Sequence, residues 1–207
     1  MSLARAITVV SVVLTTTVSA LDAQGSGLSP ADTKEIASYT LTMDAMRKYE
    51  ATLRAYTNEM KKDPKVQKLM KLQAEVAALK KKDEPTDADQ ERITALETQV
   101  ETLEEQLDDA DIGALFNSNS ISEMADMAAK APRFSVALRS AGFKPREYAV
   151  FAMALFQASM YAGMKKSGVL KDKDIPKHIS RAQLKFVEDH EAEFKAMQER
   201  FKEMSKP

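Results

Sequence analysis

Two histidines have the widest chemical range of any side chains in this chain, and neither stands in a recognisable site. His178 follows a stretch rich in lysine, and His190 lies in the sequence VEDHEAEF. A carboxylate-bridged di-iron bundle needs two Glu-x-x-His motifs, with a glutamate three residues before each histidine. Ile175 and Val187 occupy those positions here. We expect an exposed His178 and a boundary or surface His190, with no metal held by either.

The sequence also lacks cysteine and the common catalytic sequence motifs. It has no cysteine, which excludes a thiol nucleophile, an iron–sulfur site, a zinc knuckle and covalently attached haem. It contains neither a glycine-rich phosphate loop nor the G-x-S-x-G turn of serine hydrolases. Carboxylates are abundant, but they form runs typical of solvated surface. The sequence assigns no catalytic, cofactor-binding or metal-binding residue, and we expect a protein that is not an enzyme.

Methionine is the remaining candidate ligand, with twelve residues in the chain. Met43 and Met46, and likewise Met124 and Met127, form Met-x-x-Met pairs that would each share one helix face. Thioethers bind Cu(I), but methionine at this spacing more often fills an apolar core. Core packing is the favoured interpretation, and copper binding is the alternative.

Residues 1–20 have the layout of a secretory signal peptide. Arg5 precedes an uncharged run over residues 6–18, and small residues follow it. A run of about 13 residues spans about 20 Å of helix, less than the ~30 Å hydrocarbon core of a bilayer. We therefore expect cleavage after Ala20, a flexible linker over residues 21–28, and an exported protein, periplasmic or secreted, of bacterial type.

The overall charge limits the classes of partner. A formal net charge of −1 gives no long-range attraction to nucleic acid or to anionic lipid. We expect protein partners, no nucleic acid, and no stable membrane span after signal cleavage.

Helix signals begin directly after the linker. Ser29 and Pro30 are typical of a helix N-terminus, and apolar residues at helical spacing predict one long amphipathic helix over residues 29–62. Residues 110–207 predict a C-terminal helical bundle that packs with this helix. The last helix of the bundle begins after Ser180 and carries its apolar residues on one face.

Residues 63–109 predict an antiparallel helical hairpin whose two helices carry opposite charges. Residues 61–82 contain eight lysines against two acids, whereas residues 83–111 contain twelve acids against one arginine. The apolar spacing between Ile93 and Leu107 alternates between three and four, the period of a coiled coil. Whether this seam closes on its own chain or on a second copy stays open. Folding back at the intervening turn would place Lys61, Lys65 and Lys68 near Glu101, Glu104, Glu105 and Asp108.

Residues 148–164, YAVFAMALFQASMYAGM, contain no charged side chain. The stretch is shorter than the ~20 residues of a membrane span, and its apolar side chains would surround the helix on all sides, as in a buried helix. Ala154, Ala158 and Ala162 would let a neighbouring helix approach closely. The pattern predicts a central core helix, with a ligand-binding helix and membrane insertion as alternatives.

Together these patterns predict an all-α fold, a bundle of about six helices around a buried central helix, with a charged hairpin attached. The leading functional hypothesis is a non-enzymatic interaction or structural module of the cell envelope. A periplasmic holdase-type chaperone is the second hypothesis, and a helical bundle that binds metal or a small ligand is the third. Self-association is compatible with each of them.

Overall fold

A computed structural model describes residues 28–82, 84–105, 115 and 118–204 of the chain. In this part of the chain every regular element is a helix, which confirms the all-α class. The expected signal peptide over residues 1–20 and all of the expected linker except Leu28 lie outside the described residues. The same holds for residues 106–109 of the predicted hairpin.

The described residues contain nine α-helices and one 3-10 turn, η1 (Asp172–Asp174). The α-helices are α2 (Pro30–Ser38), α3 (Met43–Lys62), α4 (Pro64–Lys80), α5 (Asp87–Glu105), α7 (Ile121–Lys130), α8 (Pro132–Ser140), α9 (Pro145–Lys166), α10 (Arg181–Asp189) and α11 (Glu191–Met204).

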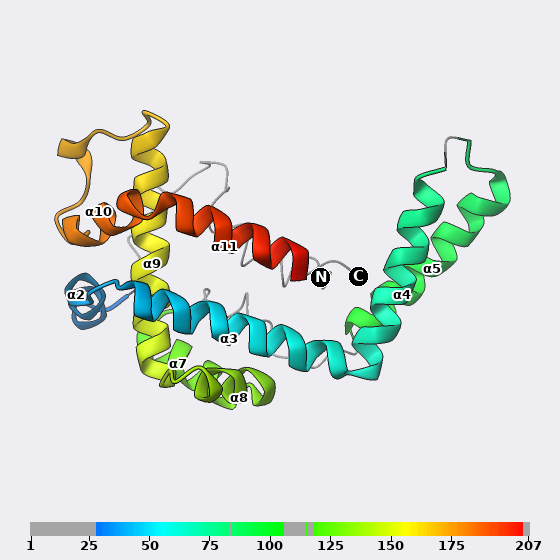
Figure 1. Ribbon diagram of the computed structural model, residues 1–207, viewed down its shortest axis with the longest axis horizontal. Coiled ribbons are helices and arrows are strands. Elements are labelled where there is room, and N and C mark those ends of the chain that lie inside the picture. Colours follow the sequence, from blue (N-terminus) through cyan, green and yellow to red (C-terminus); the bar gives the residue numbers. More distant parts are fainter. Residues whose placement is uncertain (1–27, 83, 106–114, 116–117, 205–207) are drawn as a thin grey trace.

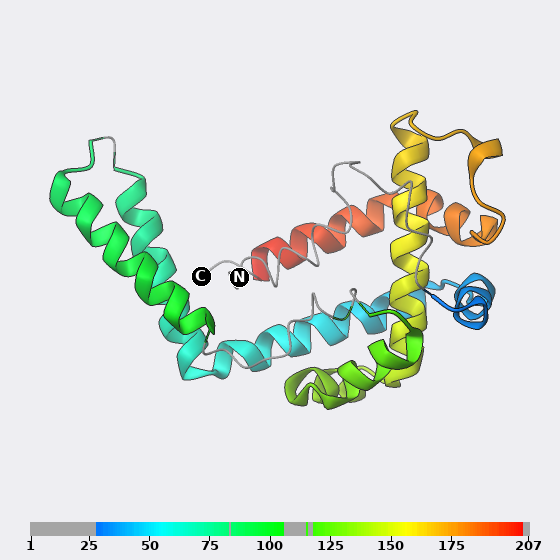
Figure 2. The same ribbon diagram turned by 180° about the vertical axis from the view of Figure 1, so that it is seen from behind.

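Helix α9, which contains the uncharged stretch, is the central helix of the body, the part of the protein formed by α2, α3 and α7 to α11. Helices α2, α7 and α10 pack against it, and α3 and α11 lie side by side and extend away from it (Figures 1 and 2). Ala149, Ala154 and Ala158 are completely buried, so they allow the neighbouring backbones to approach closely. None of the helices among the described residues combines the length and apolar character that a membrane span requires.

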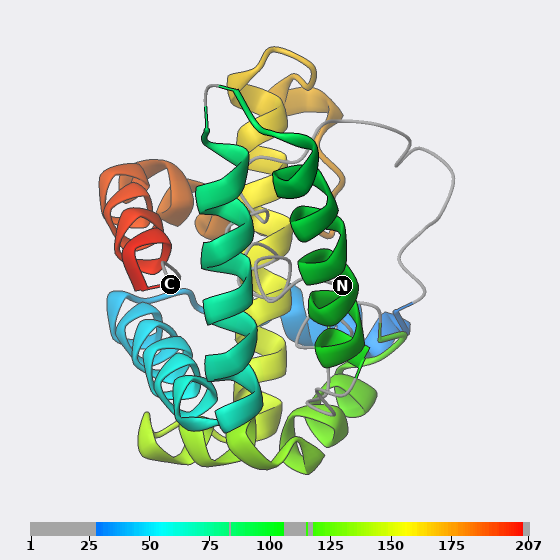
Figure 3. The same ribbon diagram turned by 90° about the vertical axis from the view of Figure 1, so that its right-hand side faces the viewer.

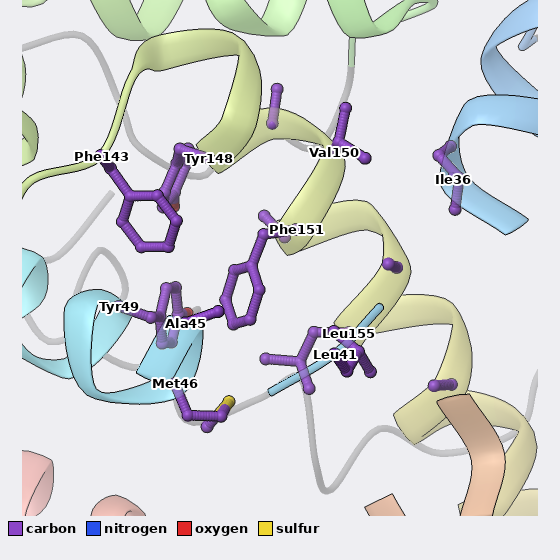
Figure 4. Close-up of a cluster of buried hydrophobic side chains, with 14 of the residues drawn as sticks. Ile36, Leu41, Ala45, Met46, Tyr49, Phe143, Tyr148, Val150, Phe151 and Leu155 are labelled. Carbon is purple, nitrogen blue, oxygen red and sulfur yellow. The ribbon is translucent and has the colours of Figure 1, made fainter. Parts of the chain in front are cut away.

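An aromatic cluster joins α9 to the helices around it (Figure 4). The Phe151 ring lies 5.4 Å from the ring of Tyr49 on α3 and 5.6 Å from that of Phe143. Tyr148 stacks on Tyr49 at 6.1 Å and meets Phe134 of α8 edge-to-face at 5.1 Å. Burial raises the pKa of both the Tyr49 and Tyr148 hydroxyls. This cluster therefore links α3, α8 and α9 in one core.

The structure corrects the prediction of one helix over residues 29–62. Helix α2 ends at an extended Tyr39, and Thr42 caps the new helix α3 by accepting a hydrogen bond from the Ala45 amide. The amide nitrogen of Gln183, on α10, donates to the carbonyls of Ile36 and Tyr39, both at 2.7 Å. A distant side chain thus replaces hydrogen bonds that a continuous helix would make.

The predicted last helix is also two helices, α10 and α11. The interruption lies at His190, whose Nδ1 is 2.9 Å from the carbonyl oxygen of Phe186. A side chain that bonds a backbone carbonyl locally competes with the regular helical pattern. Because of these two interruptions, the described residues contain more helices than the about six expected from the sequence.

Candidate functional site

Helices α4 and α5 form a two-helix arm that projects from the end of α3 (Figures 1 and 3). The two helices run antiparallel and bury Val66, Leu69, Ile93 and Leu96. None of these four side chains belongs to the main apolar cluster of the body. The arm therefore has a small apolar core of its own, and each helix is about 25–28 Å long.

The tip of the arm is held by a reciprocal cap at the start of α5. The Asp89 amide donates to the Thr86 hydroxyl at 3.2 Å, and the Thr86 amide donates to the Asp89 carboxylate at 3.0 Å. Lys82, at the end of the preceding helix, donates to the same carboxylate at 2.6 Å. Lys82 and the Thr86 donors together lower the pKa of Asp89 to about 2. The turn thus connects the basic C-terminal end of α4 to the acidic N-terminal end of α5.

Ion pairs link the two helices along the arm. Lys80 donates to Glu97 at 2.7 Å, and Arg92 donates to Glu75 at 2.9 Å. These side chains are each about half exposed, so each pair contributes less than about 1 kcal/mol. Such pairs favour one register over its alternatives more than they stabilise the arm.

The root of the arm is an elbow centred on Asp63. Its backbone ends α3, and its carboxylate caps α4 by accepting from the Lys65 amide at 2.7 Å. Arg133, from α8, forms an ion pair with this carboxylate and also lies 3.3 Å from the sulfur of Met60. Partial burial opposes ionisation of Asp63, but the Lys65 amide and Arg133 outweigh it, so its pKa lies below the usual value. Arg133 therefore connects the arm to the body.

We expect Arg133→Met to loosen this elbow and to lower the free energy of unfolding by about 1–2 kcal/mol, because Asp63 loses a charged hydrogen-bond partner. Urea unfolding measures the loss. Because the chain has no cysteine, spin labels can be placed at Thr98→Cys on the arm and Lys130→Cys on the body. Pulsed electron resonance should then give a broader distance distribution in the Arg133 variant.

Arg146→Met is the matched control. Arg146 also forms a two-pronged ion pair between distant helices, at 2.6 and 3.1 Å from Glu35, but its side chain is more exposed. Because solvent screens this exposed pair, its loss should leave the free energy of unfolding nearly unchanged and should not broaden the distance distribution. Equal effects of the two changes would contradict the assignment of Arg133 to the elbow.

A second feature is a pocket of about 170 Å³ between α3 and α11. Met43, Met46, Phe194 and Met197 give it an apolar lining, and Glu50 is among the polar residues at its edge. Arg200, across the pocket on α11, binds both oxygens of Glu50, at 2.7 and 2.8 Å.

Glu50 is held ionised by its neighbours. The hydrogen bond from Arg200 is the main cause of its lowered pKa, which burial opposes and Arg54 supports. Arg54 lies at 3.0 Å on the same helix as Glu50. The carboxylate is thus fully engaged in joining α3 to α11.

The structure places the two histidines apart from each other. His178 is exposed and lines a shallow surface hollow beside Pro30 of α2. His190 is partly buried and lies over the ring of Phe186, with 4.5 Å between ring centres. Among the described residues, no three histidine, aspartate or glutamate side chains are grouped as they would be around a metal ion.

The two Met-x-x-Met pairs have different surroundings. Met124 is buried in the body core, and the sulfur of Met127 accepts a hydrogen bond from Ser118 at 3.4 Å. Met43 and Met46 line the α3–α11 pocket together with Met197. No pattern in the sequence associates Met197 with the first pair, because only the packing of α11 on α3 brings them together.

Comparison with known proteins adds no functional guide. No family model, curated protein or solved structure significantly matches the chain. The contacts and charges of the described residues therefore carry the functional argument.

Proposed function

We propose that this is an exported, non-enzymatic protein that binds a protein partner of the cell envelope through the α4–α5 arm. The arm is the predicted charged hairpin, attached to a bundle built around α9. The proposal rests on the distribution of unpaired charges on the exposed surface of the arm, with lysines on α4 and acids on α5.

The two helices present opposite charges to solvent. On α4, Lys68 and Lys71 are exposed, and on α5 the exposed acids include Glu91, Glu101 and Glu105. None of these five side chains forms an ion pair with any described residue. A partner with complementary stripes of charge would bind in one orientation, because like charges would meet in the reversed one.

The geometry of the arm also supports a role in binding. Since the arm core is small and separate from the body core, the arm surface can change without disturbing the α9 bundle. A projecting pair of helices offers a partner two long surfaces that lie side by side. Such surfaces suit recognition by a helical groove or by other helices.

The first experiment is cross-linking of the protein in its native compartment, with the captured proteins identified by mass spectrometry. We compare Glu101→Gln/Glu105→Gln and Lys68→Gln/Lys71→Gln with the unmodified protein. Asp126→Asn/Asp174→Asn is the control, because it removes two exposed acids from the body.

One dominant partner, lost in an arm variant and kept in the control, is the expected result. A partner captured equally by all variants would contradict the role of the arm. Capture of many unrelated exported proteins would favour the holdase hypothesis instead. Turnover of a small substrate that a point change abolishes without unfolding the protein would overturn the non-enzymatic assignment.

A further inference from the structure

We propose that Met43, Met46 and Met197 form a binding site for Cu(I) in the pocket between α3 and α11. This site is separate from the arm and does not depend on its function. The three side chains come from two helices and line one pocket. Met43 and Met46 are three residues apart, which places them on one face of α3, and α11 brings Met197 to the same space.

The ligand type selects the metal. Thioether sulfur is a soft ligand that favours Cu(I) and discriminates against hard cations such as Mg²⁺ and Ca²⁺. The chain has no cysteine, so no thiolate competes with the thioethers for the ion. Phe194 and Ala196 add apolar surface to the lining, and the remaining lining residues are charged.

The charges at the pocket favour a monovalent ion. Glu50 with Arg200 and Arg54 is one negative charge against two positive charges, which leaves one positive charge, and Arg47 and Asp44 cancel each other.

Glu193 adds one negative charge to the pocket lining, which cancels this excess positive charge. It is exposed at the edge of the same pocket and forms no ion pair with any described residue. The formal charge around the pocket is therefore zero, so an ion held by three neutral thioethers adds its own charge uncompensated. A divalent ion would leave twice the uncompensated charge of a monovalent ion, which favours Cu(I).

Met124 and Met127 provide a control within the same chain. They have the same spacing as Met43 and Met46, and each pair has one buried and one half-buried member, but Met124 and Met127 do not line this pocket. Leucine has nearly the volume of methionine, so exchanges between the two disturb packing little while removing the sulfur.

The first measurement uses the purified protein labelled with ¹³C at its methionine methyl groups, titrated with Ag(I), a redox-stable substitute for Cu(I). The methyl signals of Met43, Met46 and Met197 should shift together and saturate at one ion per chain. Shifts confined to other methionines, or no saturable shift at all, would overturn the proposal.

The second measurement is competition with a chromophoric chelator for Cu(I), carried out under anaerobic conditions. Met43→Leu/Met46→Leu/Met197→Leu should weaken binding by about a hundredfold or more, while Met124→Leu/Met127→Leu should leave it unchanged. Equal binding by the two variants would reject the site. If the triple variant does not fold, Met43→Leu alone carries the comparison, because its side chain is only half-buried.

Glu193→Gln tests the charge argument separately. The variant should bind Ag(I) about tenfold more weakly, with the same three methyl signals still shifting. An unchanged affinity would remove Glu193 from the site and contradict the proposed charge balance.

Discussion

Replacement of Phe151 by alanine should lower the free energy of unfolding by about 3–5 kcal/mol, because it opens a cavity in the aromatic cluster. Phe151 is completely buried, and its ring meets those of Tyr39, Tyr49 and Phe143. For a chain of this size, the loss corresponds to a melting temperature lower by about 10 °C. Urea unfolding followed by circular dichroism measures it.

Phe156→Ala is the matched control, since Phe156 lies on the same helix and is only partly buried. Less apolar surface leaves water when this ring packs, so its loss should cost about 1–2 kcal/mol. Losses of equal size at the two positions would contradict the arrangement in which α9 is buried most deeply at the aromatic cluster.

Replacement of Gln183 by leucine should cost about 1–3 kcal/mol, although the side chain keeps nearly the same size. Gln183 is 3% exposed and donates to the carbonyls of Ile36 and Tyr39. The variant leaves the Tyr39 carbonyl without its donor, whereas the Ile36 carbonyl keeps the hydrogen bond from the Tyr39 amide at 3.2 Å. An unpaired buried polar group costs about 1–3 kcal/mol. Amide hydrogen exchange should also become faster in α2, because its end would no longer be tied to α10.

Gln183→Glu distinguishes lost hydrogen bonds from lost packing. An ionised carboxylate cannot donate to the two carbonyls, whereas a protonated one can donate to one of them. Folding would therefore raise the pKa of the introduced carboxyl above its unfolded value, so the folded state binds the proton more tightly. The stability deficit should be largest at neutral pH and shrink as the pH falls through the raised pKa. A deficit independent of pH would contradict the hydrogen-bonding role.

Local signals in the sequence predicted the helix starts well. Ser29 and Ser180 each accept a hydrogen bond from the amide three residues later, at 3.1 and 3.4 Å. The turn after α8 is a local feature too: Gly142 has a positive φ of 76°, and the Phe143 amide donates to the Leu138 carbonyl at 2.9 Å. These features depend on neighbours within five residues, so the sequence alone specifies them.

Features that depend on distant contacts could not be predicted in the same way. The break after α2 is stabilised by Gln183, which lies more than a hundred residues further along the chain. The register of the arm depends on contacts worth less than about 1 kcal/mol each, and Glu104 accepts a hydrogen bond from Gln73, a partner that a count of charges does not indicate. The pocket containing Met197 exists only once α11 lies on α3.

The separate core of the arm has a consequence for the order in which the chain can acquire structure. Its cross-links join residues close in sequence, as between Lys80 and Glu97, 17 residues apart. The body closes through contacts that span most of the chain, as between Glu50 and Arg200, 150 residues apart. Closing short loops is faster than closing long ones. The arm can therefore form before the apolar face of α3 packs against α9 and α11. The packing of these two helices on α3 then limits how quickly the body folds.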